Sequence, residues 1–238
     1  MLSVNDFFSG CGGLSQGFKE AGFKIQLAVD KEETFLETFS HNFKGSDTKK
    51  LDLGDENILK SIPKSDIIIA GPPCQGFSLT GPRNIDDPRN KLYLSVFKTL
   101  KLTNPKAFIV ENVRGLKTMW NGQVYKEILK KFESAGYLVS ESLLNSADYG
   151  VPQIRHRVFI VGIKKELDKK YVFPNKEFNK ENYISCEEAI GDLPSLADEK
   201  VANGNFKPKP VTDFQKYVMD SNILYNHQPT IHKKFVKE

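Results

Sequence analysis

The stretch Ile67-Ile68-Ile69-Ala70-Gly71-Pro72-Pro73-Cys74-Gln75 joins a short apolar run to a stiff loop that carries a cysteine. The apolar run, rich in β-branched isoleucine, predicts a buried strand, and the Gly-Pro-Pro that follows predicts its abrupt end. Because consecutive prolines each fix φ at about −65°, the loop beyond the strand is rigid. Open α/β sheets place reactive groups beyond the carboxyl ends of their strands, which makes Cys74 a candidate catalytic residue. The alternative is a cysteine that only packs in a tight turn.

Similar apolar runs recur on either side of this stretch, at residues 25–29, 107–110 and 158–163. Helix-like stretches lie among them, at residues 14–21, 92–102 and 125–134. Strands that alternate with helices predict an α/β fold with a mostly parallel sheet and helices on both of its faces.

The character of the sequence changes after Gly162. Residues 164–182 are rich in lysine and keep no hydrophobic period, so they predict a linker on the surface. A capping-box pattern at Ser185 and Glu188 predicts a short helix that ends near Gly191. Beyond residue 198 the asparagine, glycine and proline content predicts irregular structure. We therefore expect a catalytic, cofactor-binding domain at residues 1–165 and a linker region at 166–238.

Composition narrows the class of protein without naming a function. The 34 basic and 30 acidic residues leave a net charge of +4, which permits a nucleic-acid partner but does not argue for one. Cys11, Cys74 and Cys186 are far apart and form no Cys-x-x-Cys pair, so we expect reduced thiols and no bound metal. No apolar run approaches the roughly 20 residues needed to cross a bilayer. The N-terminus also lacks a signal-peptide pattern, so we expect a cytoplasmic protein without a membrane partner.

We expect a first strand near the N-terminus, and the glycine-rich loop Ser9-Gly10-Cys11-Gly12-Gly13 separates it from the predicted helix at 14–21. Glycine at such a loop lets the backbone approach a bound ligand closely. The run at 25–29 ends at Asp30, where a carboxylate can accept both ribose hydroxyls of an adenosine-containing cofactor. The loop is Gly-x-Gly-Gly rather than Gly-x-Gly-x-x-Gly, which disfavours a pyrophosphate dinucleotide. A glycine-rich turn without a ligand is the plainer alternative.

Charged residues follow or precede two other predicted strands. Glu111 comes directly after the run at 107–110, and Arg155 and Arg157 lie at alternate positions just before the run at 158–163. Taken singly, each has an ordinary explanation as a helix cap, an ion-pair partner or a solvated strand edge. Their joint occurrence in this order, after a Pro-Pro-Cys loop, is far more specific.

Together these segments resemble the 5-methylcytosine-forming DNA methyltransferases, over residues 4–163 and more weakly through Asn226-His227-Gln228-Pro229. The resemblance implies the Rossmann-like fold of methyltransferases that use S-adenosylmethionine and release S-adenosylhomocysteine. It also implies double-stranded DNA as the partner, in a bacterial restriction-modification system, with the protein in the cytoplasm at the nucleoid.

The resemblance also assigns roles to individual residues. Cys74 would be the nucleophile on carbon 6 of a flipped cytosine, and Glu111 would contact the edge of the base. Arg155 and Arg157 would contact phosphate and base. The other residues would hold the cofactor: Phe8 on the adenine; Gly10, Cys11, Gly12 and Gly13 at the methionine part; Asp30 at the ribose, with Lys31 beside it where the family often has a bulkier residue; Asp52 and Leu53 around the adenine; Pro73 and Leu92 closing the pocket.

Other readings of the sequence give different functions. RNA-acting members tend to show Pro-Pro-Cys-Gln-Pro-Phe-Thr, whereas Gly76-Phe77-Ser78 follows Gln75 here, so DNA is favoured over transfer RNA. The family's later Gly-Asn segment and its target-recognition region have no counterpart in the chain. We therefore expect a truncated product or one subunit of a split enzyme, which needs a C-terminal partner subunit. A non-catalytic binding partner stays open, while a nicotinamide dehydrogenase would not need the Pro-Pro-Cys loop.

Overall fold

The computed structural model describes residues 1–73, 92–194, 209–219 and 227 of the chain. The chain divides into two compact units, one of residues 1–145 and 155–175 and the other of residues 146–154 and 176–238. This division differs from the one expected at residue 165. Residues 166–175 stay with the first unit, where the Ser140 hydroxyl donates a hydrogen bond to the Tyr171 carbonyl at 2.7 Å.

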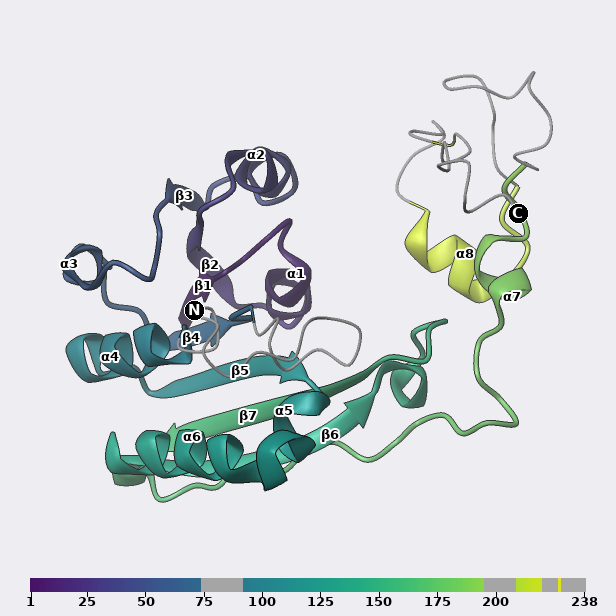
Figure 1. The fold of residues 1–238 in the computed structure, drawn as a ribbon. Coiled ribbons are helices and arrows are strands. Elements are labelled where there is room, and N and C mark those ends of the chain that lie inside the picture. Colours follow the sequence, from purple (N-terminus) through teal and green to yellow (C-terminus); the bar gives the residue numbers. More distant parts are fainter. Residues whose placement is uncertain (74–91, 195–208, 220–226, 228–238) are drawn as a thin grey trace, which may run out of the picture. The chain divides into compact units, whose positions relative to one another are not determined.

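The first unit is built on a seven-stranded sheet in the order β3-β2-β1-β4-β5-β7-β6 (Figure 1). Strand β7 pairs antiparallel with β5 and β6, and the pairs among β1 to β5 are parallel. The predicted α/β fold with a mostly parallel sheet is therefore confirmed. The strands are β1 (Ser3–Phe7), β2 (Lys24–Asp30), β3 (Asp47–Lys50), β4 (Ile67–Ala70), β5 (Ala107–Val113), β6 (Tyr137–Asn145) and β7 (His156–Lys164).

The apolar runs predict β2, β4, β5 and β7, and β1 is the strand expected before the glycine-rich loop, but β3 and β6 were missed. Both missed strands lie at an edge of the sheet. Strand β3 reads Asp-Thr-Lys-Lys, and β6 carries serine and glutamate between its apolar residues. An edge strand does not need the continuous apolar run of a strand buried on both faces.

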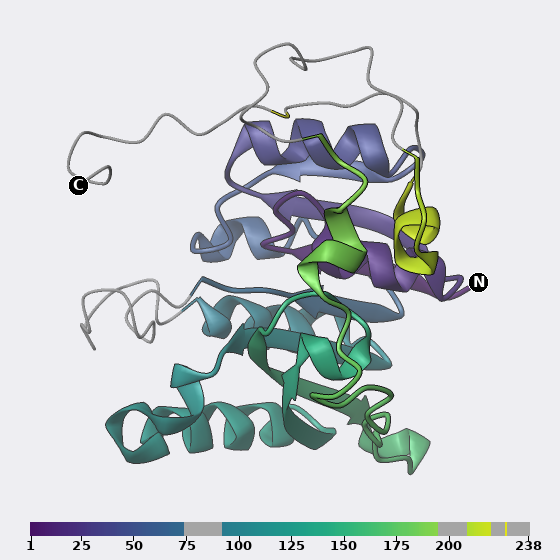
Figure 2. The same ribbon diagram turned by 90° about the vertical axis from the view of Figure 1, so that its right-hand side faces the viewer.

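Helices cover both faces of the sheet (Figures 1 and 2). Side chains of α1 and α2 pack with one buried cluster, and side chains of α3, α4, α5 and α6 pack with the other. The three predicted helices of this unit are thus confirmed as α1, α4 and α6. The helical segments are α1 (Gly13–Glu20), α2 (Glu33–Asn42), α3 (Glu56–Leu59), α4 (Tyr93–Thr103), α5 (Gly115–Thr118), η3 (Met119–Gly122), α6 (Gln123–Ser134) and η5 (Lys165–Leu167).

The described part of the second unit contains η4 (Ser146–Tyr149), α7 (Cys186–Ile190) and α8 (Asp213–Val218). The predicted capping box is present, because the Ser185 hydroxyl accepts from the Glu188 N–H while the Glu188 carboxylate accepts from the Ser185 N–H. Helix α8 corrects the expectation of irregular structure beyond residue 198. Its own capping box, formed by Thr212 and Gln215, supplies the local reason that the sequence reasoning overlooked.

In the portions of the chain that the structure describes, no helix is both long enough and apolar enough to cross a membrane.

One glycine of β7 is required by packing. Gly162 lies opposite Phe108 of β5, and a Cβ added to Gly162 would fall 2.0 Å from the Phe108 ring. That ring is fully buried and contacts the rings of Phe132 and Tyr137, with centroids 4.6 and 5.0 Å away. The ring therefore has little room to move.

We expect Gly162→Ala to destabilise the protein by about 1–3 kcal/mol, the usual cost of overpacking a core. Gly17 is the matched control, because it lies in the middle of α1 with no atom within 4 Å of its added Cβ. Gly17→Ala should stabilise by up to about 1 kcal/mol, since alanine favours a helix. Urea denaturation of the two variants measures both values, and equal stabilities would contradict the packing argument.

Candidate active site

The order of the strands places a crevice between β1 and β4. From β1 the strand order continues through β2 to one edge of the sheet, and from β4 it continues through β5 to the other edge. Ligands of open α/β sheets bind at such a switch point, outside the carboxyl ends of the strands. Here the two loops that leave these ends begin at Phe8 and at Gly71.

Phe8 has a left-handed backbone, with φ of 55°. A non-glycine residue in this region is strained, and such strain collects at ligand sites. Phe8 is held there on both sides, because the Ser9 N–H donates to the Val29 carbonyl and the Gly71 N–H donates to the Phe7 carbonyl, each at 3.2 Å. The Phe8 side chain lines a cavity at the end of the sheet.

The carboxylate of Asp30 ties the glycine-rich loop to the end of β2. One oxygen accepts from the Gly10 N–H at 2.9 Å, and the other accepts from the Glu32 N–H at 3.0 Å. Each carboxylate oxygen has two lone pairs, so both can still accept a ligand hydroxyl. Gly10 has φ of +52° and open space where a Cβ would lie, as a loop that approaches a ligand requires.

The cavity has a volume of about 940 Å³ and is lined by apolar and charged side chains of the first unit. It brings together eight of the eleven residues that the sequence analysis assigns to a cofactor. These are Phe8, Gly10, Asp30, Lys31, Asp52, Leu53, Pro73 and Leu92.

The cavity does not include the other three, Cys11, Gly12 and Gly13. Cys11 is exposed, and Gly13 begins α1. Gly12 is explained by packing, because its φ is +98° and an added Cβ would lie 2.3 Å from the Phe43 ring. The sequence pattern treats all these glycines alike, whereas only Gly10 lines the cavity.

Nine residues of the lining were not predicted. Leu51 and Gly54 flank the predicted Asp52 and Leu53, and Glu56 forms an ion pair with Lys98 of α4. The signal for α4 was available, because Ser95 lies three residues after Leu92 and Lys98 lies four residues after Leu94, which are spacings of one helix face. The full set is Glu32, Phe35, Leu51, Gly54, Glu56, Gly71, Leu94, Ser95 and Lys98.

Glu111 and Arg157 meet beside this cavity. Because β7 runs antiparallel to β5, its first residues lie at the carboxyl edge of the sheet, with Arg157 opposite Val113. Arg157 Nε lies 2.8 Å from Glu111 Oε1, and about a quarter of each side chain is exposed. Burial raises the pKa of the Glu111 carboxyl above its ordinary value, although the positive charges of Arg157 and Arg155 pull it down. Glu111 thus holds a proton to higher pH than an ordinary glutamic acid.

Arg155 is placed close to this pair by a backbone contact. The Arg155 N–H donates to the side-chain oxygen of Asn145, at the end of β6, over 3.1 Å. Its side chain is exposed, and its charge reaches Glu111.

The loop that leads to the predicted nucleophile is anchored from β5. Asn112 is buried, and its amide donates to the carbonyl of Pro72 at 3.2 Å. Glu111 and Asn112 are neighbours in one strand, so their side chains point to opposite faces of the sheet. Cys74 itself lies outside the described residues, which end at Pro73 and resume at Leu92.

A carboxyl group that the sequence reasoning missed lies beneath the glycine-rich loop. Asp6 of β1 is 1% exposed, and one of its oxygens accepts from the Ser15 hydroxyl of α1 at 2.6 Å. Its other oxygen has no hydrogen-bond partner. Burial and the nearby charge of Asp30 raise the pKa of Asp6 to about 7, against the opposing effect of the Ser15 hydrogen bond.

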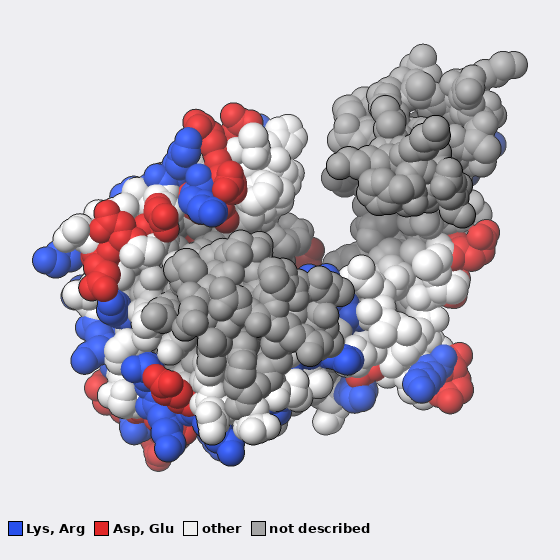
Figure 3. Space-filling view, viewed as in Figure 1, with Lys and Arg blue, Asp and Glu red and all other residues white. Residues whose placement is uncertain are grey.

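Charges of both signs are interspersed on the described surface of the first unit that Figure 3 shows. This agrees with the small net charge of +4.

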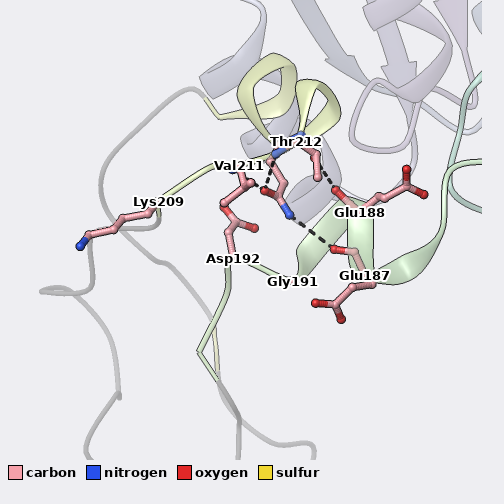
Figure 4. Close-up of a pocket in the computed structure, with 8 residues that line it drawn as sticks. Glu187, Glu188, Gly191, Asp192, Lys209, Val211 and Thr212 are labelled. Carbon is pink, nitrogen blue, oxygen red and sulfur yellow. Dashed lines mark hydrogen bonds between the residues drawn. The ribbon is translucent and has the colours of Figure 1, made fainter.

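A smaller cavity, of about 460 Å³, lies in the second unit beside α7 and α8 (Figure 4). Its polar groups bond to one another: Thr212 donates to the Glu188 carbonyl, and the Gln215 amide donates to the Glu187 carbonyl. The Gln215 side-chain oxygen accepts from the backbone of Val211 and Thr212. These bonds hold α7 and α8 together, and we assign the cavity a structural role.

The fold and the site together define an α/β protein with a large cavity at the carboxyl ends of its parallel strands, next to a paired carboxyl and guanidinium. Comparison with known sequences specifies the family. The chain matches the family of C-5 cytosine-specific DNA methylases over residues 2–237, and it belongs to that family.

Curated relatives include two type II methyltransferases. The chain is 40% identical to M.DdeI of Desulfomicrobium norvegicum over 240 residues, covering 95% of this chain and 57% of that protein. It is 42% identical to M.FnuDI of Fusobacterium nucleatum, covering 95% and 62%. The chain thus spans about 60% of the length of these relatives.

Solved structures show the same fold. A DNA modification methyltransferase encoded within an E. coli prophage superimposes with a TM-score of 0.69 at 32% identity, over 82% of this chain and 56% of that one. DNMT2 of Spodoptera frugiperda gives a TM-score of 0.57 at 25% identity, over 75% and 54%. The Rossmann-like methyltransferase fold implied by the resemblance is therefore confirmed.

The raised pKa of Asp6 predicts a pH-dependent stability. The unfolded chain ionises this carboxyl near its ordinary pKa of 3.8 and the folded chain near 7, so the folded state loses stability as pH rises between these values. Relative to Asp6→Asn, wild type should lose about 3 kcal/mol between pH 5 and pH 8. Urea denaturation of both proteins across this range measures the change. A difference that stays constant with pH would show that Asp6 titrates normally.

Proposed function

We propose that the protein is a DNA cytosine-5 methyltransferase that transfers a methyl group from S-adenosylmethionine to carbon 5 of cytosine. One observation carries this proposal: the cavity and the Glu111–Arg157 pair share Gly71. Gly71 lines the cavity, and a Cβ added there would lie 3.8 Å from Glu111 Oε2. Gly71 therefore lies between a cavity large enough for a cofactor and the Glu111 carboxyl, which can contact a base.

The chemistry of the lining fits S-adenosylmethionine. Its described carboxylates (Asp30, Glu32, Asp52 and Glu56) outnumber its lysines (Lys31 and Lys98), which favours a ligand with positive sulfonium and ammonium groups. The Phe8 ring would hold the adenine, and the Asp30 oxygens would accept the ribose hydroxyls. Asp52 and Leu53 would frame the adenine, with Pro73 and Leu92 closing the pocket. When bound, this cofactor supplies an electrophilic methyl group.

Glu111 acts on the base as a proton donor. Its burial keeps the carboxyl protonated to higher pH, so it can donate to nitrogen 3 of cytosine as negative charge moves onto the ring. Arg157 orients the carboxyl through its 2.8 Å contact. Its guanidinium, with that of Arg155, provides positive charge for a base or phosphate.

Cys74 is the nucleophile in this proposal. Its thiolate forms a bond from Sγ to carbon 6, and the electron pair of the C5–C6 double bond makes carbon 5 nucleophilic. Carbon 5 takes the methyl group of the cofactor, which is left as S-adenosylhomocysteine. Water then takes the proton of carbon 5, the electron pair of that C–H bond re-forms the C5–C6 double bond, and Sγ leaves carbon 6 as a thiolate. The Asn112 contact to Pro72 positions the loop two residues before Cys74.

The substrate follows from the same chemistry. A cytosine stacked in a duplex hides carbon 6 from a thiolate, so the base must flip out, at a cost of a few kcal/mol. The relatives are named type II methyltransferases, which supports a role in a restriction-modification system and a protein that works on cytoplasmic DNA. The C-terminal partner subunit stays a prediction.

Glu111→Gln should keep the affinity for S-adenosylmethionine and lower the rate of methyl transfer by about 10²–10⁴-fold, since an amide cannot transfer the proton. Transfer of a labelled methyl group to duplex DNA measures the rate, and calorimetry measures the affinity. An unchanged rate would remove Glu111 from the mechanism.

Duplex DNA that contains 5-fluorocytosine should trap the protein covalently in the presence of S-adenosylmethionine. Fluorine replaces the hydrogen of carbon 5, so the proton loss that releases the cysteine cannot occur. The adduct is detected on a denaturing gel, with the chain alone and supplemented with the C-terminal region of a relative. Cys74→Ser should form none. Fluorocytosine-substituted transfer RNA is the competing substrate. Trapping on transfer RNA but not on DNA would show that RNA, not DNA, is the substrate. No trapping under any condition would refute the covalent mechanism.

A further inference from the structure

We propose that Phe35 of α2 is a second aromatic contact for the adenine ring of the cofactor, a role that rests on the proposed function. Phe35 and Phe8 are the aromatic side chains among the described residues that line the cavity. Phe8 is predicted from the sequence to contact the adenine, whereas Phe35 has no predicted role.

The position of Phe35 on its helix directs it away from the core. Leu36 and Phe39 of α2 are 6% and 0% exposed and pack beneath the helix, whereas Phe35 is 43% exposed. The Phe35 N–H donates to the Glu32 carbonyl at 3.2 Å, so Phe35 lies in the first turn, next to the end of β2. An exposed aromatic ring in a cavity wall offers apolar surface that a ligand can cover.

The described residues that line the cavity next to Phe35, at the end of β2, offer no other aromatic ring. The end of β2 contributes the charged residues Asp30, Lys31 and Glu32 to the cavity. The Lys31 amino group lies 3.8 Å from the Glu32 carboxylate. A lysine stem cannot stack on a purine as a ring does. Phe35, in the first turn of α2, places an aromatic surface in this wall.

The test measures binding to the full chain, independently of methyl transfer. Calorimetry with S-adenosylhomocysteine should give a Kd about tenfold weaker for Phe35→Ala, the usual scale for loss of an aromatic contact. Phe35→Tyr should stay within about twofold of wild type, and Phe35→Leu should fall between them, since it keeps apolar bulk without a ring. 5′-Methylthioadenosine, which lacks the amino-acid part, should show the same fold-loss as S-adenosylhomocysteine.

Controls separate the possible outcomes. Phe35→Trp should bind normally and give indole fluorescence that S-adenosylhomocysteine quenches, and Tyr171→Ala, an exposed aromatic residue outside the cavity, should bind as wild type does. Equal affinities of wild type, Phe35→Ala and Phe35→Leu would overturn the role of Phe35 and leave the proposed function intact. A loss for S-adenosylhomocysteine but not for 5′-methylthioadenosine would also overturn it. Failure of wild type to bind either ligand would overturn both proposals.

Discussion

The antiparallel pairing of β7 with β5 is the constraint on which the site depends. Parallel strands bring only their carboxyl ends to one edge of a sheet, so a residue at the start of a parallel strand would lie at the opposite edge. Strand β7 reverses this rule and delivers Arg157, from its beginning, to the edge where Glu111 and the loops after β1 and β4 lie. Residues separated by more than forty positions thereby form one charged pair.

Asp30 organises the cavity, as β7 organises the Glu111–Arg157 pair. Its two oxygens are bound by N–H groups from the glycine-rich loop and from the start of α2. The carboxylate thus organises the backbone around the cavity before any ligand enters, and such preorganisation reduces the ordering cost of binding. Replacing it would disturb the loop that carries Phe8 and Gly10 as well as any contact to a ribose.

Sequence reasoning succeeds where local chemistry decides the outcome. Apolar runs predict β2, β4, β5 and β7, and the Ser185 capping box predicts α7, because each pattern has one dominant structural solution. It fails where tertiary packing decides: Gly12 is needed beneath Phe43, and the edge strands β3 and β6 carry too few apolar residues to be seen. Phe35 and Lys98 reach the cavity only through the placement of α2 and α4 against the sheet. Asp6 was missed, because nothing in a linear pattern shows that a carboxyl will be fully buried.

The absence of a side chain at Gly162 makes room for the Phe108 ring and also affects how β5 and β7 pair. Successive residues of a strand face opposite sides, so a slip of one residue between β5 and β7 would separate Arg157 from Glu111. It would also bring Val161 or Ile163 to the position opposite the Phe108 ring, where only a residue without a side chain fits. Gly162 therefore fixes the register of the β5–β7 pair, at the end of the pair that lies away from Arg157. A shifted β5–β7 pairing is destabilised during folding, so the folded protein holds Glu111 and Arg157 within contact distance.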